Sequence, residues 1–82
     1  MAKVFTTEPQ AKVVIYNDGT IVMNGEERPN AAHCFSPRMP NDFGNISTIK
    51  QAKAGHFLLI YEMKESTPCF VAMIKNISPL PN

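Results

Sequence analysis

The sequence predicts an α+β fold in which two β-hairpins form one mainly antiparallel sheet of four or five strands, with one short helix. Two observations predict the hairpins: β-branched and aromatic residues gather at 11–24 and at 56–77, and turn residues interrupt both stretches. A third predicts the helix, because capping residues enclose a short run of helix formers at 45–55. A small β-barrel is the alternative architecture.

Length and composition limit the classes of protein that the chain can represent. Its 82 residues make a single domain with one modest core. A hydrophobic content of 44% is typical of a globular protein. The formal net charge of +1 lacks the excess of basic residues by which nucleic-acid binders neutralise phosphates. Because no apolar run has the length of a signal peptide or of a membrane span, we expect a cytoplasmic protein without a membrane partner.

The first hairpin is predicted from Asp18-Gly19, which separates the apolar runs AKVVIY and TIVMN. A two-residue type I′ turn at this position sets a register in which Ile15 faces Val22. Residues 3–7 form a possible edge strand that ends before Pro9.

The segment 25–44 is predicted to be a long loop, because it contains three prolines and shows little periodicity. It is either a binding element or a cover that packs on the sheet through Phe35, Met39 and Phe43. A helix of about two turns follows at 47–54, and Gly55 stands where a helix C-terminus favours glycine.

The second hairpin spans 56–77, is interrupted at ESTP, and leaves 78–82 as a tail. If Lys64 faces Cys69, Leu58 and Ile60 share one face with Val71 and Met73. Both hairpins are apolar on both faces, which is more than a short helix can cover. A loop, closure into a barrel, or another protein chain must cover the rest. We therefore assign partner binding to a set of apolar residues: Phe35, Met39, Phe43, Leu58, Ile60, Val71 and Met73.

These features favour a small non-enzymatic protein-binding module that occludes or recruits a protein partner, or that pairs with itself as a homodimer. No cofactor is expected, because no motif for one is present. Small, nearly neutral chains without motifs are common among phage and mobile-element accessory proteins that inhibit host machinery, so this is one possible role.

Two alternative functions rest on particular side chains. A nucleic-acid-associated regulator would use a lysine patch of Lys50, Lys53, Lys64 and Lys75, although four lysines fall short of the phosphate contacts of strong binders. A small cysteine-dependent enzyme would use Cys34 with His56. The spacing of histidines and cysteines does not match a zinc site, and we expect Cys34 and Cys69 to be free thiols although a disulfide between them stays open.

Overall fold

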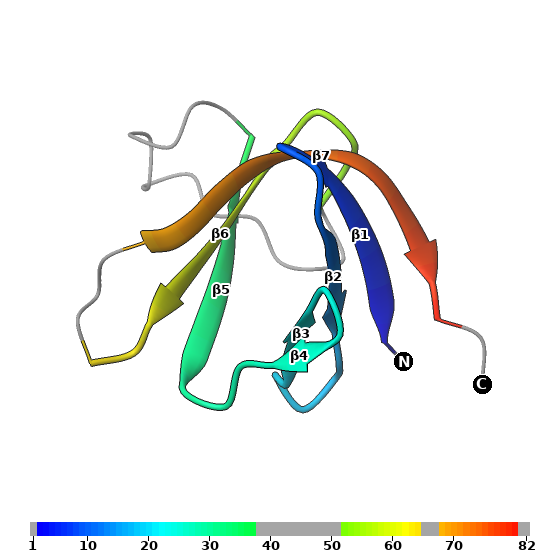
Figure 1. Ribbon diagram of the computed structural model, residues 1–82. Coiled ribbons are helices and arrows are strands. Elements are labelled where there is room, and N and C mark those ends of the chain that lie inside the picture. The colour runs from blue at the N-terminus through cyan, green and yellow to red at the C-terminus, as the bar shows by residue number, and fades with distance from the viewer. Residues whose placement is uncertain (1, 38–51, 65–67, 81–82) are drawn as a thin grey trace.

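The computed structural model describes residues 2–37, 52–64 and 68–80, and in these residues the chain is all β (Figure 1). Its antiparallel strands form one seven-stranded sheet in the order β4-β3-β2-β1-β7-β6-β5. The strands are β1 (Lys3–Glu8), β2 (Lys12–Ile15), β3 (Ile21–Met23), β4 (Glu26–Glu27), β5 (Ala31–Ser36), β6 (Phe57–Glu62) and β7 (Pro68–Pro79).

The predicted α+β class is therefore wrong. Residues 52–54, the end of the predicted helix, are not helical, and the rest of that helix lies outside the described residues. No helix of the described chain is long and apolar enough to cross a membrane. The sheet exceeds the predicted four or five strands because the segment 25–44, predicted as a loop, contributes β4 and β5. Pro29 and Pro37 flank β5 instead of interrupting it, so proline excludes no strand here.

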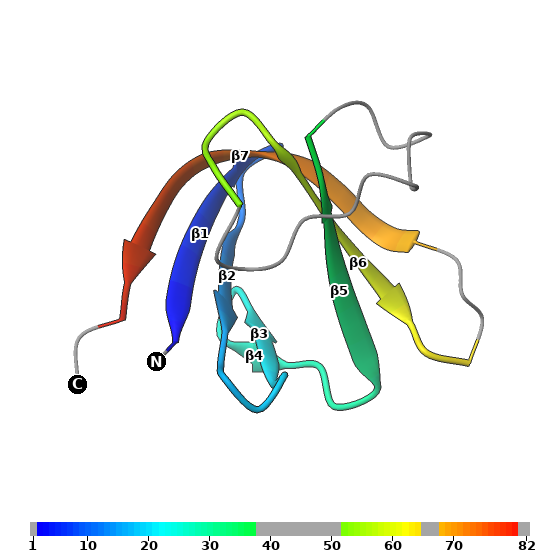
Figure 2. The same cartoon turned by 180° about the vertical axis from the view of Figure 1, so that it is seen from behind.

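The sheet curls into a half-barrel because a short link joins its two edges (Figure 2). Strands β4 and β5 lie at opposite ends of the strand order, yet only residues 28–30 separate them in the chain. In a flat sheet the first and last of these strands would lie about 29 Å apart. The link from the end of β4 to the start of β5 reaches at most about 15 Å. The two edges must therefore approach each other at this end of the sheet.

The long, bent strand β7 carries the curvature through the middle of the sheet (Figure 1). Its first half pairs with β6 and its second half pairs with β1. The register shifts twice along it, once at Cys69 and once at Lys75, and each shift leaves an extra residue in β7. Such bulges bend a strand and increase its twist. Strand β1, predicted at a sheet edge, is instead central and pairs with both β2 and β7.

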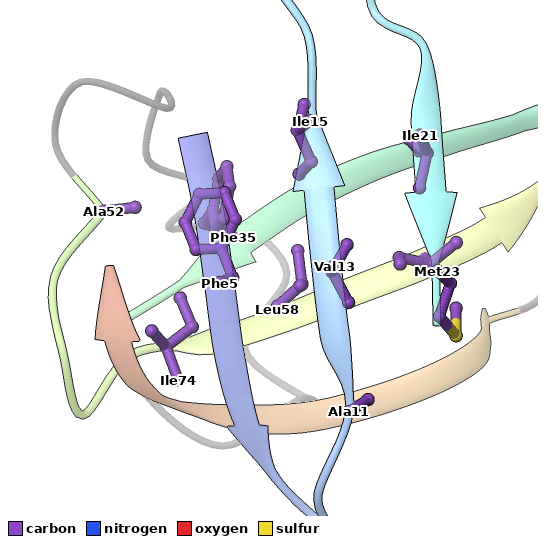
Figure 3. Close-up of a cluster of buried hydrophobic side chains, with 11 residues drawn as sticks. Phe5, Ala11, Val13, Ile15, Ile21, Met23, Phe35, Ala52, Leu58 and Ile74 are labelled. Carbon is purple, nitrogen blue, oxygen red and sulfur yellow. The ribbon is translucent and has the colours of Figure 1, made fainter. Parts of the chain in front are cut away.

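One hydrophobic core fills the concave side of the sheet (Figure 3). Phe5 and Phe35 meet at its centre, with ring centroids 5.5 Å apart. Alternate side chains of both halves of the sheet and one residue before β6 complete the buried cluster: Ala11, Val13, Ile15, Ile21, Met23, Ala52, Leu58, Ile60 and Ile74. The curled sheet thus covers one apolar face of both predicted hairpins by packing its two halves against each other.

The first hairpin forms, but its turn has three residues and its register differs from the prediction by one. Tyr16 pairs with Thr20 around the turn, and Ile15 faces Ile21 where Val22 was expected. Gly19 takes the positive φ of +93°, while the Asp18 carboxylate accepts the Thr20 N–H at 2.9 Å. A type I turn followed by glycine in the left-handed region is the usual three-residue hairpin.

The two-residue turn with two positive φ angles occurs one hairpin later. Asn24 and Gly25 have φ values of +52° and +86° and connect β3 to β4. The Asn24 side chain also accepts the Lys12 N–H at 2.9 Å, which ties this turn to β2. Asn-Gly is a strong hairpin signal in a sequence, and here it marks a strand pair that the prediction missed.

The second hairpin also forms in a different register. Ile60 faces Phe70, so Phe70, Ala72 and Ile74 join Leu58 on the core face. Val71 and Met73 consequently lie on the outer face, opposite the side where the predicted register placed them. A shift by an odd number of residues moves every side chain of a strand to the other face. Strand β7 continues to Pro79, into the segment predicted to be a tail.

Replacing Asp18 with glycine tests the three-residue turn. In this turn Asp18 does not need a positive φ, so Asp18→Gly removes the bond to Thr20 and adds freedom to the unfolded chain. The free energy of unfolding, measured by urea denaturation, should fall by about 1–2 kcal/mol. In the predicted two-residue turn the same change would relieve strain, so a rise in stability would contradict this geometry.

Candidate protein-binding edge

The structure does not gather the predicted partner-binding residues on one surface. Phe35, Leu58 and Ile60 belong to the core and are at most 1% exposed. Val71 is half-buried and Met73 is 38% exposed, and the two lie together on the outer face of β7. Met39 and Phe43 lie outside the described residues.

The lysines of the alternative nucleic-acid site are also dispersed. Lys53 precedes β6 and Lys64 follows it, so the length of this strand, about 20 Å, separates them. Lys75 lies on β7 with its Nζ 3.7 Å from a carboxylate oxygen of Glu8, and both side chains are more than half exposed. Lys50 lies outside the described residues. Lys53 and Lys64 therefore share no patch.

The cysteines and histidines likewise occupy separate places. Cys34 and Cys69 are free thiols, and burial raises the pKa of Cys34, which disfavours its reactive thiolate form. The Cys69 Sγ donates to the Ile60 carbonyl at 3.2 Å. The Nδ1 of His56 accepts the Lys53 N–H at 3.3 Å. In the described part of the chain, no three His, Cys, Asp or Glu side chains are grouped to hold a metal ion.

Strand β5 is an edge of the sheet and pairs, among the described strands, with β6 alone. The Met63 N–H donates to the Asn30 carbonyl at 3.1 Å, just beyond the ladder in which Ala31 faces Glu62. Hydrogen-bonded and non-hydrogen-bonded pairs alternate along an antiparallel ladder. The backbone groups of Ala32 therefore point toward β6, whereas those of Ala31 and His33 point away from the sheet. The Ala31 N–H also makes a long 3.4 Å contact with the Arg28 carbonyl.

The two edges of the sheet differ in chemistry. Strand β4 has two residues, both glutamates, and such short, charged edges resist pairing with another chain. Strand β5 has six residues, AAHCFS, with no lysine, arginine, acid or proline among them. An uncharged edge strand of this length is a template for strand addition. Sequence reasoning missed this edge because Pro29 and Pro37 suggested a loop, although the charge-free run between them was visible.

His33 sits at the centre of this edge and does not add a charge to it. Its ring meets the Phe35 ring edge-on, with centroids 5.4 Å apart. Burial lowers the pKa of His33 below its ordinary value of 6.5. The side chain is therefore neutral at pH 7, and β5 remains an uncharged edge under those conditions.

A cavity of about 460 Å³ lies between the free edge of β5 and the opposite end of the half-barrel. We call it the edge groove, and residues 18–20, 27–29, 31–33 and 63 line it. Met63 is 65% exposed there, the most exposed large apolar side chain of the described chain. The groove has the size of common ligand pockets, and it runs beside an unpaired strand.

Arg28 lines the groove from the link between β4 and β5. Its backbone N–H donates to the Ile21 carbonyl at 2.8 Å, which fixes the start of the link. The Nε of its side chain is buried and has no acceptor among the described residues. A buried donor without an acceptor costs about 1–3 kcal/mol of stability.

Comparisons of the chain with protein-family models, with curated proteins and with solved structures give no match. The edge groove and β5 are therefore the features of the described chain that point to a function.

The lowered pKa of His33 predicts a pH dependence of stability. Because the unfolded chain binds the proton more readily than the folded one, stability is complete above about pH 6.5 and falls as the pH drops toward the folded pKa. Urea unfolding at about pH 7.5 and about pH 5 measures the change. In His33→Ala the decrease should be smaller, since the contribution of the buried imidazole is then removed. An equal decrease in both proteins would show that His33 is not buried in the neutral form.

The two cysteines should differ in their reaction with iodoacetamide near neutral pH. Cys69 is exposed, whereas Cys34 is half-buried and burial raises its pKa. We expect Cys69 to be alkylated first, as mass spectrometry of peptides would show, with Cys69→Ser as the control that isolates Cys34. Faster modification of Cys34 would contradict the structure and favour the cysteine-enzyme hypothesis.

Proposed function

We propose that this protein is a small non-enzymatic protein-binding module, which acts by occluding or recruiting a protein partner. One observation supports this function above the others: β5 is a six-residue edge strand without a charged side chain, in a chain whose other edge is short and acidic. Folded proteins usually protect such edges against pairing. An uncharged edge of the described sheet, beside a groove, is consistent with selection for a binding partner.

The mode of binding is the addition of an extended segment of the partner to β5. The outward Ala31 carbonyl and the outward N–H and carbonyl of His33 supply the hydrogen bonds, each worth about 0.5–1.5 kcal/mol net. Residue alternation then places every second side chain of the partner toward the groove. Specificity would come from these side chains, and Met63 provides an apolar contact for them.

If a partner strand adds to β5, the backbone N–H of His33 should matter for binding and its side chain should not. Two substitutions distinguish these roles. His33→Pro removes the outward N–H while leaving the bonds to β6 intact, and proline is tolerated at an edge strand when its missing N–H faces away from the sheet. His33→Ala removes the ring but keeps the N–H, so it is the matched control. Peptides selected from a random displayed library on the immobilised protein serve as probes.

We expect His33→Pro to weaken the selected peptides at least tenfold in isothermal titration calorimetry, and His33→Ala to change affinity far less. In the unmodified protein, bound peptide should slow amide hydrogen exchange at His33. This second measurement does not depend on the folding of the proline variant. A library that yields no binder, or binders that leave the His33 amide unprotected, would contradict the proposed function.

A further inference from the structure

Arg28 is the basic side chain of the edge groove, and the described chain does not satisfy it. Its Nε is the single buried side-chain nitrogen or oxygen of the described residues that lacks a hydrogen-bond partner. Asp18 and Glu27 line the same groove, yet neither forms an ion pair with Arg28. The buried Nε itself is not accessible from the groove, but the terminal N–H groups of the guanidinium are not buried and have no partner among the described residues, so they can donate to a group that enters the groove from outside.

The geometry of the guanidinium N–H donors determines which acceptor group on a ligand binds best. Its planar fork of N–H donors matches the two oxygens of a carboxylate and forms two parallel hydrogen bonds with it. A neutral amide or hydroxyl offers one weaker acceptor. The partial burial of Arg28 strengthens such a bond, because water competes less for the donors.

Asp18 and Glu27 also line the groove, but they repel an incoming carboxylate only weakly. Both side chains are exposed, so water and salt screen their repulsion. The Asp18 carboxylate already accepts the Thr20 N–H within the turn, and this bond lowers its pKa and satisfies part of its charge. The buried donor of Arg28 has no such compensation.

We infer that the segment which adds to β5 carries an aspartate or glutamate side chain that pairs with Arg28 in the edge groove. This inference rests on the proposed function and specifies the chemistry of its partner. Strand pairing at Ala31 and His33 sets the position of the segment, and the carboxylate at Arg28 sets its register. The partner is thus an extended protein segment with an acidic residue that faces the groove.

Three blocked peptides test the inference: acetyl-TVEVT-amide, acetyl-TVQVT-amide and acetyl-TVKVT-amide. They share the strand-forming frame and differ in one central side chain, so their affinities isolate its charge. The proteins compared are the unmodified chain, Arg28→Gln, Arg28→Lys and Lys64→Gln. Lys64 is exposed and directly follows the groove residue Met63, so Lys64→Gln removes a nearby positive charge that does not line the groove.

We expect the glutamate peptide to bind about tenfold more tightly than the glutamine peptide, and the lysine peptide to bind most weakly. Arg28→Gln should abolish the preference for glutamate, Arg28→Lys should retain part of it, and Lys64→Gln should leave it unchanged. The Arg28 Nε–Hε resonance of the unmodified protein should shift with the glutamate peptide alone, which provides a readout that does not depend on the variants.

The remaining outcomes separate the two proposals. Equal affinities for all three peptides, together with loss of binding in His33→Pro, would overturn the carboxylate inference and leave strand addition intact. Tightest binding of the lysine peptide would also overturn it, because Asp18 and Glu27 would then dominate the groove. Absence of binding by all three peptides would count against both.

Discussion

The short link between the two edge strands is the constraint on which the rest of the structure depends. Residues 28–30 must join strands that a flat sheet would hold far apart, so the sheet has to curl. Curling brings the two hairpin regions onto one core, with Phe5 of the first half against Phe35 of the second. The long strand β7 permits this curvature because two bulges bend it while it pairs on both sides.

The same constraint produces the candidate binding region. The link holds β5 beside the end of β3 and β4 without pairing it to them, so a groove remains between the two edges. Arg28 belongs to the link itself, and its side chain therefore enters the groove as a consequence of how the sheet is closed. The uncharged edge strand lowers solubility, and the buried Arg28 Nε, which has no acceptor in the described part of the chain, lowers stability. Such costs are expected where a site is retained for a partner.

Sequence patterns located most of the apolar strands but not their arrangement. The runs around Val13, Ile21, Leu58 and Val71 were rightly read as strands, because β-branched and aromatic residues dominate them. The registers failed because a turn that is one residue longer moves each side chain to the opposite face, and bulges such as that at Cys69 leave no local signal. Strand β5 and Arg28 gain their significance only from the curl of the whole sheet, which no local pattern contains.

Residue-resolved amide hydrogen exchange of the free protein tests the open edge most directly. If β5 pairs with β6 alone, the outward His33 amide should exchange far faster than those of Ala32 and Cys34 on either side, which donate into the ladder. Equal protection of these three neighbouring amides would mean that another strand or segment already occupies this edge, and would contradict a binding role for it.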